Sequence, residues 1–233
     1  MPFNEYRVGQ WDVGAAKQLS LHSQAAYSTT PYRCERILAG SHSVDISTFD
    51  NDCAIAFRGT DDASDWVTNL KIERVDQWGC KVHRGFSGAE KLLNRQIAQV
   101  LPEADRYWIT GHSLGGALAT LFAVRLTDAR FNVAGLYTFG SPRVGCRCFA
   151  QHADYVLAGR HYRVVHGNDI VPRVPRPFRF RHCGQQVLLD RKGRAVLSPS
   201  MAYQFLDRVL GFRFDLVRDH FMGGYVQALA RLS

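Results

Sequence analysis

The sequence of 233 residues has no apolar run long enough to cross a lipid bilayer. Its longest apolar stretch, Leu114 to Val124, falls well short of the roughly 20 residues that a membrane-spanning helix needs. The first ten residues, Met1 to Gln10, are polar and mixed and lack the apolar core of an export signal. These absences predict a soluble chain without a transmembrane segment. Its predicted location is cytoplasmic by default, with export by another route left open.

The six cysteines have poor spacing for a metal site. Cys146 and Cys148 form a C-x-C pair, which differs from the C-x-x-C spacing of zinc ribbons and redox motifs. We therefore expect no metal site. Without an export signal, free thiols are the expected state of the cysteines. Cys53 lies in an apolar run and is expected in the hydrophobic core.

The chain also lacks repeats, low-complexity segments and any linker rich in proline, glycine or serine. Residues 1–233 are therefore expected to form a single domain. Hydrophobic residues make up 46% and charged residues 21%, which excludes a disordered chain. The net charge is +8, but the arginines are spread along the sequence without a basic tail or an RNA-binding motif, so no nucleic-acid partner is expected.

Strand patterns alternate with helix patterns through most of the sequence. Residues 53–57 are apolar throughout, which is typical of a strand covered on both faces. The alternation predicts an α/β fold with a mostly parallel central sheet and helices on both faces. The expected strands are 44–49, 53–57, 107–110, 133–139 and 162–165, with an outer hairpin over 178–197; the expected helices are 12–27, 86–100, 117–126, one before 158, 201–210 and 221–229.

Residues 111–115 read Gly-His-Ser-Leu-Gly, a G-x-S-x-G motif. In a nucleophile elbow the serine occupies a strained turn between a strand and a helix, and the nearby glycines leave room for close packing. The pentapeptide alone is a weak signal, and a plain glycine-rich turn is the alternative. Here it stands between a short predicted strand and an apolar helix, so Ser113 is predicted to be a nucleophile on an α/β-hydrolase fold.

A serine hydroxyl needs a base, and the base needs an acid that orients it. In this fold the partners follow the serine in the order acid, then histidine. Asp169 is predicted to be the acid because it stands in the exit loop of strand 162–165, although a solvated loop aspartate is the alternative. Asp154 and Asp190 are weaker candidates because a helix and an outer hairpin would not aim them at the elbow.

His220 is predicted to be the base because it lies near the end of the chain, just before the last helix. His112 adjoins Ser113 but should point away from its hydroxyl. His83 and His166 are nearer competitors, since both could lie on the catalytic edge of the sheet.

Acyl transfer also requires donors for the developing oxyanion. The backbone N–H of Leu114, directly after the nucleophile, is one predicted donor. Thr60 is the other, because it follows an early strand within Phe57-Arg58-Gly59-Thr60 and offers both a backbone N–H and a hydroxyl. A simple strand-ending turn is the alternative for these residues.

Taken together, the motifs resemble the class 3 lipases, the fungal-lipase-like branch of the α/β-hydrolases. The resemblance implies the triad Ser113, Asp169 and His220, an oxyanion hole of Thr60 and Leu114, and hydrolysis of lipid esters without a cofactor. It covers the chain from about Ile55 to Tyr225. The matching pieces are Phe57-Arg58-Gly59-Thr60 with Trp66, Val82-His83-Arg84-Gly85-Phe86, Gly111-His112-Ser113-Leu114-Gly115-Gly116, Thr138-Phe139-Gly140-Ser141-Pro142-Arg143-Val144-Gly145, Val165-His166-Gly167-Asn168-Asp169, and Asp219-His220.

The stretch that corresponds to the family's lid departs from the secreted members of the family. It begins Asp61-Asp62-Ala63-Ser64-Asp65, with Trp66, Val67 and Leu70 as its main early apolar residues. Because a small, polar lid hides little apolar surface, we expect a partly open site without strong interfacial activation. An esterase acting on short or medium-chain esters, a phospholipase A acting on anionic phospholipids, acyl transfer to an alcohol and a non-catalytic lipid-binding protein therefore stay open as alternatives.

Four arginines follow Asp169 closely: Arg173, Arg176, Arg179 and Arg181. If they rim the catalytic edge, they would favour peripheral contact with an anionic lipid interface. A solvated positive face is the alternative.

Overall fold

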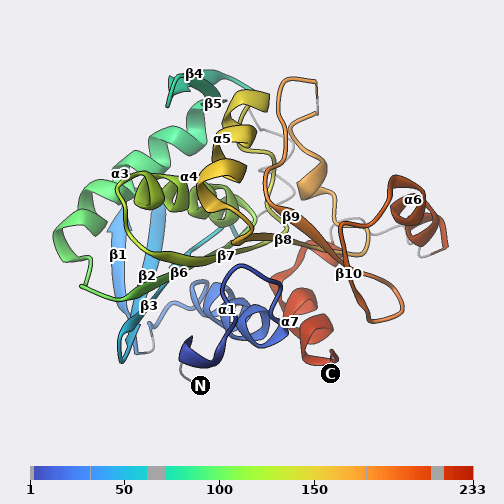
Figure 1. Ribbon diagram of the computed structural model, residues 1–233, viewed down its shortest axis with the longest axis horizontal. Coiled ribbons are helices and arrows are strands. Elements are labelled where there is room, and N and C mark those ends of the chain that lie inside the picture. The colour runs from blue at the N-terminus through green and yellow to red at the C-terminus, as the bar shows by residue number, and fades with distance from the viewer. Residues whose placement is uncertain (1–2, 32, 62–71, 177, 211–217, 233) are drawn as a thin grey trace.

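The computed structural model describes residues 3–31, 33–61, 72–176, 178–210 and 218–232 (Figure 1). Within these ranges the centre of the molecule is an eight-stranded sheet in the order β1-β2-β3-β6-β7-β8-β9-β10. The strands from β3 to β9 are parallel, whereas β1, β2 and β10 pair antiparallel at the two edges. The strands are β1 Glu35–Ala39, β2 His42–Phe49, β3 Asp52–Phe57, β6 Arg106–His112, β7 Val133–Phe139, β8 His161–His166, β9 Gln185–Leu189 and β10 Ala195–Leu197.

Helices cover both faces of the sheet (Figure 1). One face carries α3 Arg84–Val100, α4 Leu114–Asp128 and α5 Arg147–Leu157, and the other carries α1 Val13–Ala25 and α7 Met222–Ala230. Each face has its own hydrophobic core, the first largely aliphatic and the second rich in aromatic rings. The predicted fold class is confirmed, because this is a mostly parallel sheet with helices on both sides.

The apolar patterns located most elements within a few residues. The run over 53–57 is β3, and all its residues are buried between the two helix layers, as its unbroken apolar character indicates. The predicted helix over 117–126 starts earlier, at Leu114, directly after the motif serine. Only 185–189 of the predicted first hairpin arm forms a strand, and that strand pairs parallel with β8.

Several elements were not predicted. β1 is short and half exposed, and β4 Arg74–Gln77 with β5 Cys80–His83 forms a separate two-stranded sheet, so none of them has a strong periodic signal. Single turns of 3₁₀ helix occupy Phe3–Glu5, Val171–Arg173 and Arg218–His220. Helix α6, Met201–Leu210, follows the outermost strand and stands apart from both helix layers (Figure 1).

The prediction of free thiols is wrong for one pair, because Cys80 and Cys148 form a disulfide. The two residues are 68 positions apart, and their Cα atoms lie 5.6 Å apart where β5 packs against α5. Sequence spacing cannot reveal such a tertiary contact. Cys53 is fully buried in the core, as predicted, and Cys146 is a free thiol.

Candidate active site

The residues of the predicted site gather at the carboxyl edge of the parallel strands. Ser113 follows β6, Gly140 follows β7 and Asp169 lies three residues after β8. Because neighbouring parallel strands end at the same edge, these three positions are close in space although far apart in sequence.

The backbone around Ser113 makes a sharp turn between β6 and α4. Ser113 has φ 57° and ψ −128°, a left-handed conformation that is unusual for a residue with a side chain. A Cβ added at Gly115 would lie 2.1 Å from the Phe57 carbonyl oxygen, and one at Gly111 would lie 2.3 Å from the Gly115 carbonyl oxygen. Both glycines are therefore required by close backbone packing, which is the local context that a nucleophile elbow needs.

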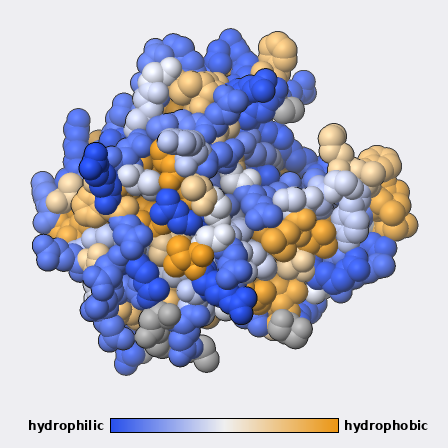
Figure 2. Space-filling view, viewed as in Figure 1, coloured by the Kyte–Doolittle hydropathy of each residue, from blue (hydrophilic) through white to orange (hydrophobic). Residues whose placement is uncertain are grey.

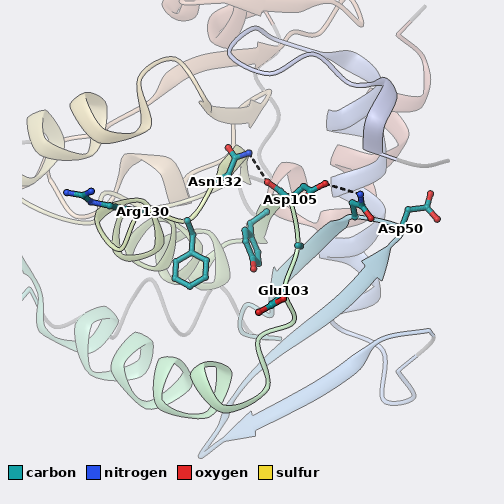
Figure 3. Close-up of a pocket in the computed structure, with 9 residues that line it drawn as sticks. Asp50, Glu103, Asp105, Arg130 and Asn132 are labelled. Atoms are coloured by element: carbon teal, nitrogen blue, oxygen red, sulfur yellow. Dashed lines mark hydrogen bonds between the residues drawn. The ribbon is translucent and has the colours of Figure 1, made fainter.

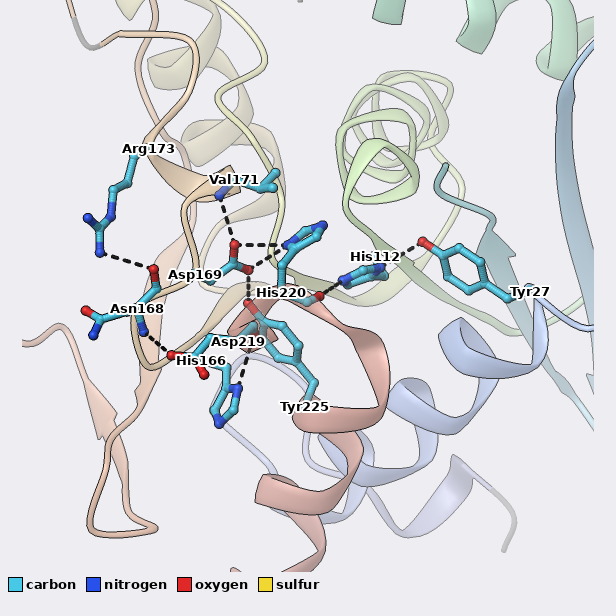
Figure 4. A network of polar contacts seen from close by, with 10 residues as sticks. All are labelled: Tyr27, His112, His166, Asn168, Asp169, Val171, Arg173, Asp219, His220 and Tyr225. Atoms are coloured by element: carbon cyan, nitrogen blue, oxygen red, sulfur yellow. Dashed lines mark hydrogen bonds and ion pairs between the residues drawn. The ribbon is translucent and has the colours of Figure 1, made fainter. Parts of the chain in front are cut away.

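Asp169 and His220 form a buried pair (Figure 4). The His220 Nδ1 atom lies 3.0 Å and 2.9 Å from the two carboxylate oxygens of Asp169. The carboxylate also accepts hydrogen bonds from the Val171 backbone N–H at 2.8 Å and from the Tyr225 hydroxyl at 2.5 Å. These donors fix the carboxylate and stabilise its charge, so it can orient the imidazole.

The Asp169–His220 pair is also constrained by its neighbours. The Asp219 carboxylate accepts a hydrogen bond from the Asn168 backbone N–H at 2.8 Å. Gly140 lies against the pair so closely that an added Cβ would sit 2.6 Å from Asp169 Oδ2 and 3.0 Å from the His220 ring. A side chain at position 140 would therefore displace the pair.

His112 links His220 to the amino-terminal helix region (Figure 4). Its Nε2 lies 2.6 Å from the His220 backbone carbonyl, and its Nδ1 lies 2.7 Å from the Tyr27 hydroxyl. The His112 ring also stacks on the His220 ring, with centroids 4.5 Å apart. Burial, with a smaller electrostatic contribution from the neighbouring His220, lowers the pKa of His112 well below its usual value. His112 is therefore neutral, so it donates through Nε2 and accepts from Tyr27.

No hydrogen bond joins the described side chains of Ser113 and His220. Ser113 Oγ and His220 Nε2 are both buried, and neither has a hydrogen-bond partner among the described residues. The two residues are nevertheless neighbours, because the adjacent His112 ring stacks on His220 and the Ser113 N–H donates to the Phe139 carbonyl, next to Gly140. Hydrogen bonds of this kind are often long in unliganded enzymes and tighten when substrate is bound.

The predicted oxyanion donors lie at the same turn. Leu114 is the first residue of α4, where backbone N–H groups have no intrahelical partner and the helix dipole favours negative charge. Gly59, just before Thr60, packs against the elbow: a Cβ there would lie 2.5 Å from the His112 carbonyl oxygen and 3.2 Å from Ser113 Cβ. Thr60 Oγ1 is buried, and in the part of the chain that the structure describes it has no hydrogen-bond partner.

The competing candidates make other contacts. His83 caps α3 and stacks on Phe86, and His166 contacts the Asp219 backbone carbonyl. Asp154 accepts a hydrogen bond from the Gly184 N–H, and Asp190 organises the turn of the β9–β10 hairpin. None of these four side chains pairs with His220 in the part of the chain that the structure describes.

The four arginines after Asp169 do not form one rim. Arg173 donates to the Asn168 carbonyl, next to the catalytic acid candidate. Arg179 instead lines a surface hollow with Arg74 and Lys81 of the β4–β5 hairpin.

Residues 62–70 of the predicted lid stretch lie outside the described residues. The expectation of a partly open site is wrong for this structure, because Ser113 is fully buried and His220 is 2% exposed. The expected absence of strong interfacial activation was argued from an open site, so that argument no longer holds. The expectation itself stays a prediction.

A surface hollow of about 500 Å³ lies at the opposite edge of the sheet (Figure 3). It lies beside the amino ends of β6 and β7, where Asn132 and Asn51 donate to Asp105. Its lining carries more acidic than basic side chains and includes no residue of the predicted triad. Because the helix and strand ends that carry Ser113 and Asp169 are at the other edge, this hollow does not belong to the candidate site.

Sequence reasoning missed two supporting residues, Tyr225 and Tyr27. Tyr225 lies in α7, the helix that follows His220, and Tyr27 lies just past α1. Neither stands in a motif, so only the fold shows that they contact Asp169 and His112.

The sequence model of a family described as Lipase (class 3) matches residues 54–178, more than half of the chain. Among curated proteins, a secreted mono- and diacylglycerol lipase of Fusarium solani is 36% identical over 60% of this chain and 44% of its own length. A triacylglycerol lipase of Arabidopsis thaliana is 31% identical over 74% of this chain and 45% of its own length. The chain thus spans less than half the length of these curated relatives.

Solved structures show the same fold. The structure titled "A serine protease triad forms the catalytic centre of a triacylglycerol lipase" superimposes with a TM-score of 0.70 and 26% identity, covering 89% of this chain and 92% of that one. A fungal lipase–inhibitor complex superimposes with a TM-score of 0.69 and 24% identity, over 92% and 95% of the two chains.

The prediction of a cytoplasmic location is overturned by the comparisons. The matched lipases of Fusarium solani and Penicillium cyclopium are both named as secreted proteins. Among the described residues, no helix has the length and apolar character needed to cross a membrane.

Proposed function

Since the chain belongs to the class 3 lipase family, we propose that it hydrolyses the carboxylic esters of acylglycerols through an acyl-enzyme on Ser113. The observation that carries the proposal is the buried Asp169–His220 pair beside a serine in a left-handed turn. These are the parts that acyl transfer requires: a nucleophile, a base and a group that orients the base.

In the first half-reaction, Ser113 Oγ attacks the ester carbonyl carbon while His220 Nε2 accepts the hydroxyl proton. The carbonyl oxygen becomes an oxyanion, which the Leu114 N–H and Thr60 stabilise. When the intermediate collapses, the bond to the glycerol oxygen breaks, and that oxygen takes the proton from His220. The products are the alcohol and an ester between Ser113 and the acyl group.

In the second half-reaction, water gives a proton to His220 and attacks the acyl carbon. The Ser113 Oγ leaves with that proton, and the fatty acid is released. Throughout both steps the Asp169 carboxylate, held by hydrogen bonds from the Val171 N–H and the Tyr225 hydroxyl, orients the His220 ring.

Acylglycerols are the proposed substrates because the matched relatives are named as mono-, di- and triacylglycerol lipases. Their names do not favour the alternatives of a phospholipase or a non-catalytic lipid-binding protein. The secreted relatives, together with the Cys80–Cys148 disulfide, support action outside the cell, where disulfides persist.

The test is hydrolysis of mono-, di- and triacylglycerols, phospholipids and a soluble p-nitrophenyl ester by wild type and Ser113→Ala. We expect activity on acylglycerols and a loss of about 10⁶-fold in turnover for Ser113→Ala, as measured for a nucleophile in another triad enzyme. A Ser113→Ala protein as active as wild type would refute the assignment.

Matched controls separate catalysis from folding. Ser41→Ala changes an exposed serine between β1 and β2, and His152→Gln changes a half-buried histidine on α5. Both should keep wild-type turnover, whereas His220→Gln should lose it with an unchanged melting temperature. Equal losses for His152→Gln and His220→Gln would contradict the role of His220.

A further inference from the structure

Helix α6 is amphipathic, and its polar side faces the protein. The Tyr203 hydroxyl donates to Asp190 at 2.6 Å, and Gln204 accepts from the Gln186 amide at 3.2 Å. The Asp207 carboxylate pairs with Arg191 at 3.6 Å and is buried. The polar residues therefore fasten α6 to the β9–β10 hairpin.

The apolar side of the same helix faces solvent. Phe205 and Val209 are 68% and 55% exposed, and the other apolar residues of α6 are exposed as well: Met201, Ala202, Leu206 and Leu210. Figure 2 shows this side as a group of hydrophobic side chains at the right-hand edge, where Figure 1 places α6. A surface helix normally turns this side toward the core, so the inverted orientation points to an apolar partner.

The inverted helix lies at the catalytic edge of the sheet. β9 runs parallel to β8, and their carboxyl ends are in register at His166 and Leu189. The hairpin turn that holds Tyr203 and Asp207 begins at Asp190 and therefore lies beside the loop that carries Asp169. The Gly167 N–H, two residues before Asp169, donates to the Leu189 carbonyl.

Basic residues lie close to α6. Burial and, second, the positive charge of Arg208 lower the pKa of Arg173, which shows that the two arginines are neighbours. Neither forms an ion pair with a described carboxylate. Five basic residues stand against three carboxylates here: Arg173, Arg191, Lys192, Arg194 and Arg208 against Asp169, Asp190 and Asp207. The surroundings therefore suit an anionic surface.

We propose that α6 is an interface anchor that inserts Phe205, Val209 and their apolar neighbours into a lipid surface with anionic headgroups, while Arg173 and Arg208 contact those headgroups. An amphipathic helix flanked by basic residues binds lipid in this way, with its apolar side at the boundary of the acyl chains. The inference rests on the proposed function, since it gives the enzyme a means of meeting its lipid substrate. Helix α6, the proposed anchor, lies outside the lid stretch.

The test is co-sedimentation with vesicles of phosphatidylcholine, alone or with an equal amount of phosphatidylglycerol. We expect the wild type to prefer the mixed vesicles and to lose that preference at high salt. Phe205→Ser with Val209→Ser should weaken binding to the mixed vesicles by about tenfold or more, since two exposed apolar side chains no longer enter the lipid. Arg208→Gln should weaken it roughly fivefold, and only on anionic vesicles.

The matched control is Tyr155→Ser with Leu92→Ser, an exposed aromatic and an exposed aliphatic residue on α5 and α3. It should bind within about twofold of wild type. Met201→Ser, at the start of α6, gives an independent measurement on the same helix side. The proposal is overturned if both α6 variants bind as wild type, or if the control loses as much. It is also overturned if wild type dimerises through α6, shown by a dimer that the double variant dissociates while vesicle binding stays unchanged.

Two measurements distinguish this inference from the proposed function. Ser113→Ala should bind vesicles as wild type does, because binding needs no turnover. The double α6 variant should hydrolyse a soluble p-nitrophenyl ester at the wild-type rate. A wild type that binds vesicles but cleaves no ester would refute the hydrolase and leave the anchor standing; the reverse result would refute the anchor alone.

Discussion

Helices α4 and α6 are both rich in apolar residues, yet the fold treats them in opposite ways. α4 lies between α3 and α5 on the sheet, and twelve of its residues are buried, from Leu114 to Leu126. In α6 the only buried residue among those described is the charged Asp207. The apolar side chains of α4 stabilise the protein itself, whereas those of α6 stay available to a partner.

The difference shows what apolar content can and cannot predict. Unbroken apolar character around α4 leaves one solution, burial on all sides. The two-sided pattern of α6 has two solutions, and the choice depends on whether its polar side finds partners. Tyr203, Gln204 and Asp207 find them on the β9–β10 hairpin, so the apolar side turns outward.

The largest expected effect separates the two helices directly. Leu121→Ala in α4 should lower the free energy of unfolding by about 2–5 kcal/mol, because it opens a cavity in a fully buried layer. The matched change Leu206→Ala in α6 should stay within about 0.5 kcal/mol of wild type. Denaturant unfolding of both variants measures the contrast. Equal losses would mean that α6 packs like a core helix.

Mild acid should weaken the surroundings of α4 before it releases α6. Burial lowers the pKa of His112, which directly precedes Ser113. Burial and the charge of Arg163 lower the pKa of His161 to about 3. His161 lies across a small cavity from Thr120 of α4. Unfolding lets both histidines take up protons below about pH 6.5, so stability falls as the pH drops, by up to about 1.4 kcal/mol per pH unit for each.

The α6 contacts should survive the same acid. Burial acts to raise the pKa of Asp190, but hydrogen bonds from Tyr203 and Arg194 outweigh it and hold that pKa below its usual value. The stabilisation by this carboxylate is thus lost only at a pH below that usual value. Unfolding at about pH 7.5 and about pH 5.5, with proteolysis of α6 followed in parallel, measures the order. Release of α6 first would contradict it.

The smallest effect concerns the polar fastening of α6. Asp207→Asn weakens a partly buried ion pair with Arg191, so we expect a loss of about 0.5–1 kcal/mol. The loss should be local, so proteolytic cleavage within α6 should accelerate while the global unfolding midpoint hardly moves. Glu73→Gln, in an exposed pair with Arg84, is the control and should change neither quantity. A global shift would show that α6 unfolds together with the core.

Much of the central fold could be predicted because its elements have strong local signals. The apolar run of β3, the Asp12 cap of α1 and the periodic residues of α3 each indicate one structure. β1 and the β4–β5 hairpin could not be predicted, because these strands are short and partly exposed. They are stabilised by pairing with neighbouring strands, which leaves no strong pattern in the sequence. The Cys80–Cys148 disulfide likewise depends on tertiary contact.

The candidate site, like the fold, could be predicted from the sequence only in part. Ser113, Asp169 and His220 could be chosen because strand order and chain order restrict where a nucleophile, acid and base can stand. The roles of Tyr225 and Tyr27 could not, because each depends on one side-chain hydrogen bond across the fold. The closed state of the site was also missed, since burial of Ser113 depends on the packing of the whole edge.

The hydrogen-bonded series Tyr27–His112–His220 determines how far the protein can be shortened. A fragment cut at the borders of the family match, residues 54–178, would retain Ser113 and Asp169 but lose both His220 and Tyr27. Any trimmed version for crystallisation or for grafting onto another scaffold must keep the first helix and the last one together. The segment that the site needs is therefore longer than its recognisable motifs, because Tyr27 and His220 both contact His112, the residue before the nucleophile.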